Sequence, residues 1–210
     1  MSENKTNLQW CRLITPFILA GGKSQRMGTS KSFVKLGSQP LIEIVIQKVT
    51  DFFHKQPVLI TNQFADYRYL GCDMVGDIIQ GKGPLGGIQA GLIKSVTPYI
   101  FVFACDMPFI DKTLVHYMLN RLGREDILIP RYGTRMEPLH AIYSKRCLPA
   151  ITAHLDNDRR SVQSFFDEVN VVYIDQAEMN RLQVPEYCFL NINTREELDN
   201  AKAYLDNLRS

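Results

Sequence analysis

Several features that mark specialised protein classes are missing from this sequence of 210 residues. Its five cysteines are widely scattered and never form a Cys-x-x-Cys pair, which argues against a disulfide framework and against a zinc site. Its four histidines show no ligand spacing either. The longest apolar run, from Tyr99 to Cys105, is far too short to cross a bilayer, and residues 1–7 are polar with no signal-peptide core. We therefore expect a cytoplasmic protein without a membrane segment.

A strong excess of one charge is also missing. Lys and Arg number 24 and Asp and Glu 22, which gives a net charge of +2, and the sequence has no long basic run. Proteins that bind nucleic acids usually show such runs, so a small phosphorylated partner is the better expectation. The sequence also has no internal repeat, low-complexity segment or linker. Because 45% of the residues are apolar, we expect one sizeable core, with a polar leader over residues 1–12 and a single domain over residues 13–210.

Apolar patterning predicts strands that alternate with helices along the chain. The expected strands cover residues 13–20, 58–60, 74–75, 99–104, 127–129 and 139–143. The expected helices begin near residue 40 and at the glycine-rich stretch 81–87, cover residues 64–70, 111–122, 147–154 and 161–168, and end with one that starts at a capping box, Thr194 to Glu197. For the helix near residue 40 we expect Ser38 as N-cap and Pro40 in the first turn. This alternation indicates an α/β fold with an open, mostly parallel sheet, in which ligands bind beyond the carboxyl ends of the strands.

The first expected strand leads into a loop rich in glycine and positive charge. Residues 19–31 read Leu-Ala-Gly-Gly-Lys-Ser-Gln-Arg-Met-Gly-Thr-Ser-Lys. Glycines let backbone amides converge on an anion, and Arg26 and Lys31 add fixed positive charge, a combination suited to a nucleoside triphosphate. The loop is not a Walker A loop, because no glycine lies four residues before a Gly-Lys-Ser/Thr unit. An ordinary glycine turn with two solvated cations is the alternative.

A second glycine-rich stretch, residues 81–86, matches Gly-x-Gly-x-x-Gly. This match is weak, because a dinucleotide fingerprint belongs at the first strand-to-helix turn and Pro84 removes one of the amides. We interpret the stretch as a wall of a nucleotide pocket, where glycines admit a flat base. Asp77, at the preceding strand end, is placed to accept hydrogen bonds from a guanine edge or a ribose, and a solvated turn aspartate remains the alternative.

Asp106 follows the most buried of the expected strands, residues 99–104. A carboxylate at that strand end is well placed to hold a hard cation, since Mg²⁺ typically takes one or two protein carboxylates together with phosphates and waters. A turn or helix-cap aspartate before Pro108 is the alternative. Cys105 and His140 fit packed residues better than a nucleophile and a base, because no partner spacing links them.

Residues 19–31 resemble the Leu-Ala-Gly-Gly-x-Ser-x-Arg-Met-Gly-x-x-Lys signature of Rossmann-like nucleotidyltransferases. The Ala-Gly-Gly form resembles the molybdenum cofactor guanylyltransferases, the MobA family. The resemblance extends over nearly the whole chain beyond the leader, through residues 83–87 (Gly-Pro-Leu-Gly-Gly), 105–108 (Cys-Asp-Met-Pro), 138–143 (Pro-Leu-His-Ala-Ile-Tyr) and 191–194 (Asn-Ile-Asn-Thr). Two departures concern the nucleotide contacts: Ser30 stands where the family commonly has an acidic residue, and Thr61-Asn62 where it often has two asparagines.

The resemblance implies a single-domain, three-layer Rossmann-like nucleotidyltransferase fold and a set of site residues. Nucleotide binding is expected from Leu19, Ala20, Gly21, Gly22, Lys31, Asn62, Asp77 and Asp106. Catalysis is expected from Asp106, Lys31 and Arg26, with Asp106 as the ligand of Mg²⁺, for which Mn²⁺ can substitute.

Candidates for contacts to a second substrate lie toward the C-terminal end. Arg159 and Arg160 could grip a terminal phosphate, and Asn191 and Asn193 could donate to and accept from a pterin ring. Of the two arginines, we assign Arg160 to substrate binding. A solvated arginine pair, and a role for Asn191 in fixing the cap at Thr194, remain open at this point.

By resemblance, the reaction is transfer of GMP from GTP to the terminal phosphate of Mo-molybdopterin. The acceptor is already an oxyanion, so positioning and charge neutralisation suffice without a general base. Molybdoenzyme apoproteins and cofactor-insertion chaperones are implied as further partners, and we expect a monomer. A CTP-dependent sibling, a sugar-phosphate nucleotidyltransferase and a non-catalytic cofactor carrier remain alternatives, although a mere carrier has no need of Asp106 together with Lys31.

Overall fold

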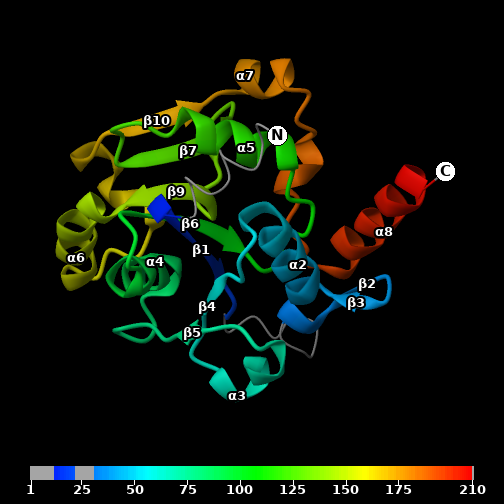
Figure 1. Cartoon of the computed structure of the whole chain (residues 1–210), viewed down its shortest axis with the longest axis horizontal. Helices are drawn as coiled ribbons and strands as arrows, with labels where there is room; N and C mark the ends of the chain where they lie inside the picture. Colours follow the sequence, from blue (N-terminus) through cyan, green and yellow to red (C-terminus); the bar gives the residue numbers. More distant parts are fainter. Residues whose placement is uncertain (1–11, 22–30, 210) are drawn as a thin grey trace.

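The chain folds around one large sheet flanked by helices (Figure 1), and the computed structural model describes residues 12–21 and 31–209. The strands, in chain order, are β1 (Ile14–Leu19), β2 (Lys35–Leu36), β3 (Gln39–Pro40), β4 (Val58–Ile60), β5 (Met74–Val75), β6 (Tyr99–Ala104), β7 (Ile127–Tyr132), β8 (Arg135–Met136), β9 (His140–Ser144) and β10 (Val171–Ile174). The α-helices are α2 (Leu41–Phe53), α3 (Phe64–Tyr67), α4 (Gly83–Lys94), α5 (Lys112–Arg121), α6 (Leu148–Asp156), α7 (Gln176–Arg181) and α8 (Arg195–Arg209). The 3₁₀ helices are η1 (Lys31–Phe33), η2 (Arg68–Leu70), η3 (Lys145–Cys147), η4 (Val162–Glu168) and η5 (Glu186–Phe189).

The strand order places β1 and β6 at the middle of the sheet. The order is β10-β7-β9-β6-β1-β4-β5, and β8 adds to β7 as the eighth strand. β1 runs parallel to both β4 and β6, β4 runs parallel to β5, and β7 runs parallel to β10. β9 lies antiparallel between β6 and β7, and β8 pairs antiparallel with β7. The expected mostly parallel sheet is thus confirmed.

Helices cover both faces of this sheet. All residues of β6 are buried, and from Tyr99 to Phe103 their side chains alternate between two apolar clusters. Phe101 and Phe103 pack into the cluster that includes residues of α2, α5 and α7, whereas Ile100 and Val102 pack into the cluster formed with α4 and α6. The three-layer α/β architecture expected by resemblance follows from this arrangement. Within the described residues, no helix is long and apolar enough to span a membrane.

The start of α2 differs from the sequence prediction. Ser38 lies in the turn of the β2–β3 hairpin, next to Gly37 with its φ of 66°, and does not cap the helix. Pro40 occupies the N-cap position, before the first turn, and makes no side-chain cap bond. The amide of Leu41 instead donates to the carbonyl oxygen of Val34 at 2.9 Å. The backbone of the segment before the hairpin therefore pairs one of the free amides at the start of the helix.

Two expected helices also take another form. Residues 161–168 form the 3₁₀ helix η4, in which Val162 and Phe165 are buried three positions apart, the repeat of a 3₁₀ turn. Residues 64–70 divide into α3 and η2, and Gly71 ends η2 in the left-handed conformation with a φ of 68°. The short elements β8, β10 and α7 were not predicted. The capping box at Thr194 is confirmed, as the Glu197 amide donates to Thr194 Oγ1 at 3.1 Å and the Thr194 amide to Glu197 Oε2 at 2.8 Å.

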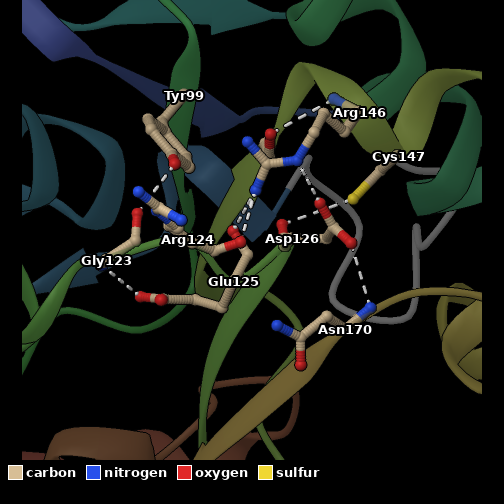
Figure 2. Close-up of polar contacts among 9 residues, drawn as sticks. Tyr99, Gly123, Arg124, Glu125, Asp126, Arg146, Cys147 and Asn170 are labelled. Carbon is tan, nitrogen blue, oxygen red and sulfur yellow. Dashed lines mark hydrogen bonds and ion pairs between the residues drawn. The ribbon is translucent and has the colours of Figure 1, made fainter.

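A polar cluster lies where β7 and β10 begin, and Figure 2 shows its contacts. Arg146 Nε donates to Asp126 Oδ1 at 2.6 Å, and Arg146 Nη2 donates to the carbonyl oxygens of Arg124 and Glu125 at 2.7 and 2.8 Å. The Asn170 amide donates to Asp126 Oδ2 at 3.0 Å. Because these residues precede the parallel strands β7 and β10, they lie at the edge of the sheet opposite to the carboxyl ends of the parallel strands. Their contacts hold neighbouring segments of the fold together.

Candidate active site

Four parallel strands end together at one edge of the sheet. The register pairs Leu19 of β1 with both Ile60 of β4 and Ala104 of β6. Backbone bonds continue the pairing just past the strands, from the Ala20 amide to the Ile60 oxygen at 2.9 Å and from the Cys105 amide to the Leu19 oxygen at 3.2 Å. The segments after β1, β4, β5 and β6 therefore share one edge. Leu19, Ala20, Gly21, Asn62, Asp77 and Asp106, all expected in the nucleotide site, lie on these segments.

Asp106 lies directly after β6, partly buried, in a turn whose backbone is held from two sides. The Met107 amide donates to the Ala104 oxygen at 3.4 Å, and the Ile192 amide donates to the Asp106 oxygen at 2.9 Å. Burial raises the pKa of the Asp106 carboxyl, the Lys31 ammonium counteracts this rise, and the Glu197 carboxylate adds to it. Asp106, Lys31 and Glu197 are thus close enough to act on one another electrostatically.

Lys31 and Asn193 meet at the same place, although 162 positions separate them in the sequence. Lys31 Nζ donates a hydrogen bond to Asn193 Oδ1. Asn193 is held in turn by its amide, which donates to Glu197 Oε2 at 2.6 Å. Glu197 therefore forms the cap at the start of α8, together with Thr194, and this leaves the proposed capping role of Asn191 without support. Two of the expected site residues, Lys31 and Asn193, are joined directly.

Asn62 and Asp77 form a second joined pair beside the ends of β4 and β5. Asn62 Nδ2 donates to Asp77 Oδ2, and the Asp77 amide donates to Asn62 Oδ1, both at 2.9 Å. Gly76 leaves room for the pair, since a Cβ there would lie 3.1 Å from Asn62 Oδ1 and would press on it. Both side chains were expected in the nucleotide site, and the structure fixes the orientation of each by the other.

Arg160 lies in a different group, on the segment that follows α6. Arg160 Nε and Nη2 each donate to the Asp158 carboxylate at 3.0 Å. Lys82, at the start of α4, donates to the same carboxylate at 3.0 Å and to the Leu155 oxygen at 2.7 Å. The paired cations lower the pKa of Asp158. Within residues 12–21 and 31–209, Arg160 has no hydrogen bond or ion pair with Asp106 or Asn193, and it is linked through Asp158 to Lys82 of the glycine-rich stretch 81–87 instead.

Several expectations concern residues beyond these groups. Gly22 and Arg26 lie outside the described residues. Burial raises the pKa of the Cys105 thiol to about 12 and lowers the pKa of His140 to about 3, so neither side chain can serve as nucleophile or base near neutrality. This confirms their interpretation as packed residues. Lys82, Asp158 and Glu197 were not singled out as site residues, because their spacing in the sequence gives no sign of the contacts they make.

The site can bind an anion and a cation side by side. Lys31 supplies a positive charge and Asp106 a negative one, at the end of the central strands where ligands of open α/β sheets bind. Within the described part of the chain, no group of three or more His, Cys, Asp and Glu side chains could hold a metal ion. A cation at Asp106 would therefore need ligands from a substrate or from water.

Comparison with known proteins gives consistent matches over most of the chain. The family model of the MobA-like NTP transferase domain matches residues 16–172. A probable molybdenum cofactor guanylyltransferase of Pelotomaculum thermopropionicum is 36% identical over 93% of this chain and 95% of the relative. One from Peptoclostridium acidaminophilum is 36% identical over 86% of this chain and 85% of the relative.

Solved structures agree with the sequence matches. The molybdopterin-guanine dinucleotide biosynthesis protein A of Archaeoglobus fulgidus superposes with a TM-score of 0.80 at 25% identity, over 92% of this chain and 99% of that one. A 4-diphosphocytidyl-2C-methyl-D-erythritol synthase of Anaerococcus prevotii, at 16% identity and a TM-score of 0.70 over 93% of this chain and 97% of that one, shares the fold. The strand-end site, the family match and the curated relatives agree, and the chain is a nucleotidyltransferase that belongs to the MobA-like NTP transferase family.

Proposed function

We propose that this protein transfers GMP from GTP to the terminal phosphate of Mo-molybdopterin, which yields molybdopterin guanine dinucleotide and pyrophosphate. The observation that carries the proposal is the meeting of Lys31, Asn193 and Asp106 at the end of β1 and β6, within a chain whose curated relatives bear the name of this activity. The proposed setting is the cytoplasm and the proposed working form a monomer. Molybdoenzyme apoproteins and cofactor-insertion chaperones are proposed as partners that receive the product.

The proposed reaction is an in-line displacement at the α-phosphorus of GTP. An oxygen of the acceptor phosphate forms a bond to that phosphorus, the bond to the bridging oxygen breaks, and its electron pair leaves with pyrophosphate. No proton has to be removed, because the attacking oxygen is already charged. We assign Lys31, and Arg26 of the undescribed segment, to stabilise charge on the α-phosphate and on the leaving group.

A divalent cation, Mg²⁺ or Mn²⁺, fits beside Asp106. The carboxyl is partly buried and its pKa is raised, which means that the protein alone compensates its negative charge incompletely. One carboxylate is also a donor set that suits Mg²⁺, which commonly completes its shell with phosphates and water. When bound, the ion would neutralise phosphate charge in the transition state.

Asp77 is proposed to read the base. Its carboxylate is oriented by Asn62 and stands at a strand end beside the glycine-rich stretch 81–87. A carboxylate that faces the N1 and N2 edge of guanine is left unpaired by adenine or cytosine, which disfavours both. Leu19, Ala20 and Gly21, at the end of β1, are proposed to contact the same nucleotide through the backbone, as is Gly22.

Arg160, Asn191 and Asn193 are proposed to bind the acceptor. Arg160 is exposed, and its Nε and Nη2 donors are paired with the Asp158 carboxylate, so a terminal phosphate would either replace this carboxylate or bind the other edge of the guanidinium. The side-chain oxygen of Asn193 accepts a hydrogen bond from the Lys31 ammonium, and its side-chain nitrogen Nδ2 is a further donor. The acceptor would then lie between the start of α8 and the segment after α6.

Incubation with each of the four NTPs and Mo-molybdopterin tests the proposal, with pyrophosphate release and the dinucleotide product as readouts. We expect kcat/KM for GTP to exceed that for ATP or CTP by about a hundredfold or more, the usual effect of an unpaired hydrogen-bonding edge. Comparable kcat/KM values with CTP would assign the chain to the cytidylyltransferase sibling. Binding of the finished dinucleotide without any pyrophosphate release would identify a carrier.

A further inference from the structure

A buried row of polar groups lies beneath the Lys31–Asp106 pair. The Tyr67 hydroxyl donates to Ser32 Oγ at 2.8 Å, and Ser32 Oγ lies 3.2 Å from Cys105 Sγ. The three residues are almost wholly enclosed, with exposed fractions of 0% for Tyr67, 2% for Ser32 and 8% for Cys105. The Gly21 amide also donates to the Cys105 sulfur. Every member of the row thus has a polar partner within the protein.

The row links η1 and α3 to the segments after β1 and β6, which the sheet already holds side by side. Ser32 follows Lys31 in η1, Cys105 precedes Asp106 after β6, Gly21 ends the β1 segment, and Tyr67 closes α3. The ring of Phe33 packs on that of Tyr67 with their centroids 5.0 Å apart, which adds an apolar contact between η1 and α3. A single serine hydroxyl therefore lies between the backbone that carries the lysine and the backbone that carries the aspartate.

The polarity of the row makes it directional. A serine hydroxyl has one proton to donate, and because Ser32 Oγ accepts from Tyr67, its own proton is free to point at the Cys105 sulfur. Buried polar groups of this kind stabilise a structure only in the one arrangement that pairs them all. Apolar residues of the same size would fill the space, but they would not fix the relative orientation of the backbone segments that carry Lys31 and Asp106.

We propose that Tyr67 and Ser32 are positioning residues, which hold the Lys31 ammonium and the Asp106 carboxylate in the mutual geometry that the transfer reaction needs. The inference rests on the proposed function, since it assigns Lys31 and Asp106 to phosphate and metal. It adds a role for α3, which no motif of the sequence connects with the reaction. Both side chains are enclosed by the protein. Tyr67 acts through its hydrogen bond to Ser32, and Ser32 acts through its chain neighbour Lys31 and through Cys105, the chain neighbour of Asp106.

The test compares Tyr67→Phe and Ser32→Ala with a matched control, Tyr99→Phe. Tyr99 also buries its ring and donates from its hydroxyl to a carbonyl, that of Gly123 at 3.1 Å, but at the start of β6, away from the site. For all proteins we would measure the melting temperature, the kinetic constants for GTP, and the Mg²⁺ concentration that gives half-maximal rate.

We expect Tyr67→Phe to lower kcat about tenfold and Ser32→Ala about tenfold to a hundredfold, because small misplacements of catalytic groups cost this much in rate. KM for GTP should change little, and both variants should need more Mg²⁺. Tyr99→Phe should lose comparable thermal stability and keep the wild-type kcat and Mg²⁺ requirement.

The outcomes separate the two proposals. One outcome is that the wild-type enzyme is active and the folded variants Tyr67→Phe and Ser32→Ala keep its kcat and Mg²⁺ dependence. That result would overturn the positioning role and leave the proposed function standing. Wild-type protein without GMP transfer would overturn the proposed function. In that case, the rise in melting temperature that Mg²⁺ adds to GTP binding decides the positioning role: a smaller rise in Tyr67→Phe than in Tyr99→Phe supports it, and equal rises contradict it.

Discussion

Asp106 and Asp111 show how two aspartates after the same strand can differ in role. Asp111 accepts a hydrogen bond from the Leu114 amide at 2.8 Å and caps α5, whereas the pKa of the Asp106 carboxyl is raised by burial and lowered by the charge of Lys31. Asn caps a helix about as well as Asp, but it lacks the negative charge that a cation needs. The same substitution at the two positions therefore separates capping from metal binding.

We predict that Asp106→Asn leaves the protein folded and lowers the rate of pyrophosphate release by about a hundredfold or more, with partial recovery at raised Mn²⁺ or Mg²⁺. Rates at saturating GTP and acceptor, together with a thermal melt, provide the measurement. Asp111→Asn, the control, should melt and turn over like the wild type. Near-normal turnover of Asp106→Asn would remove the residue from the metal site and end the mechanism proposed for it.

At this scale, the sequence was informative where a residue follows a strand or belongs to a motif. Asp106, Lys31 and Asn193 were singled out for those reasons, and the structure brings them together. The contacts that orient them could not be predicted, because the partners are far apart in the sequence and have no motif of their own. Glu197 was predicted only as part of a capping box, and its closeness to Asp106 depends on how α8 packs.

At the scale of the elements, α4 packs closely against the sheet through two glycines. A Cβ at Gly91 would lie 3.2 Å from Ile60 Cδ1 and 3.3 Å from Ile100 Cδ1, closer than side chains normally approach. A Cβ at Gly87 would meet Leu19 Cδ2 at 3.1 Å. The two glycines thus let α4 lie directly on β1 and β4.

We predict that Gly91→Val destabilises the protein by about 1 to 3 kcal/mol, the usual cost of overpacking, because its methyl groups have to displace these neighbours. Urea unfolding would measure the change. Lys94→Val, the control, places the same side chain on an exposed position of the same helix. It should lower the free energy of unfolding by about 0.5 kcal/mol or less, through helix propensity alone. Equal losses in the two variants would show that the close contact is unimportant.

Elements with long apolar stripes were predictable, and short ones were not. The continuous apolar run of β6 gave that strand at its observed bounds, and the apolar stripe of α2 gave a helix that starts near residue 40. The β2–β3 hairpin, each strand of which has two residues, has too few side chains for a periodic pattern. Its existence moved the start of α2 and made the Ser38 prediction wrong.

At the scale of the whole molecule, the two edges of the sheet have separate tasks. The strand ends carry the candidate site residues, whereas the Arg146 cluster of Figure 2 ties together segments that precede β7 and β10. The direction of β9 was beyond the reach of the sequence, because an apolar strand pattern looks the same in parallel and antiparallel pairs. Mostly parallel order was predictable from the alternation of strands and helices.

We predict that Arg146→Ala lowers the melting temperature by about 2 to 4 °C, the shift that about 1 kcal/mol produces in a protein of this size, and leaves kcat unchanged at 25 °C. The loss arises because Asp126 and two carbonyl oxygens lose their donor. Arg195→Ala serves as control for stability, since its 3.9 Å ion pair with Asp199 is exposed and should contribute little. A fall in kcat with Arg146→Ala would mean that the two edges are coupled.

The bond between Lys31 and Asn193 has a consequence for biosynthesis. On the ribosome, Lys31 is translated early, but its partner follows 162 codons later, immediately before the last helix. The nascent polypeptide can pair most of its sheet before Asn193 and Glu197 have been synthesised. At that stage Asp106 also lacks the hydrogen bond that its carbonyl oxygen accepts from the Ile192 amide. Chains that stop prematurely, through a nonsense codon or a stalled ribosome, would therefore resemble the mature fold without being able to consume nucleotide.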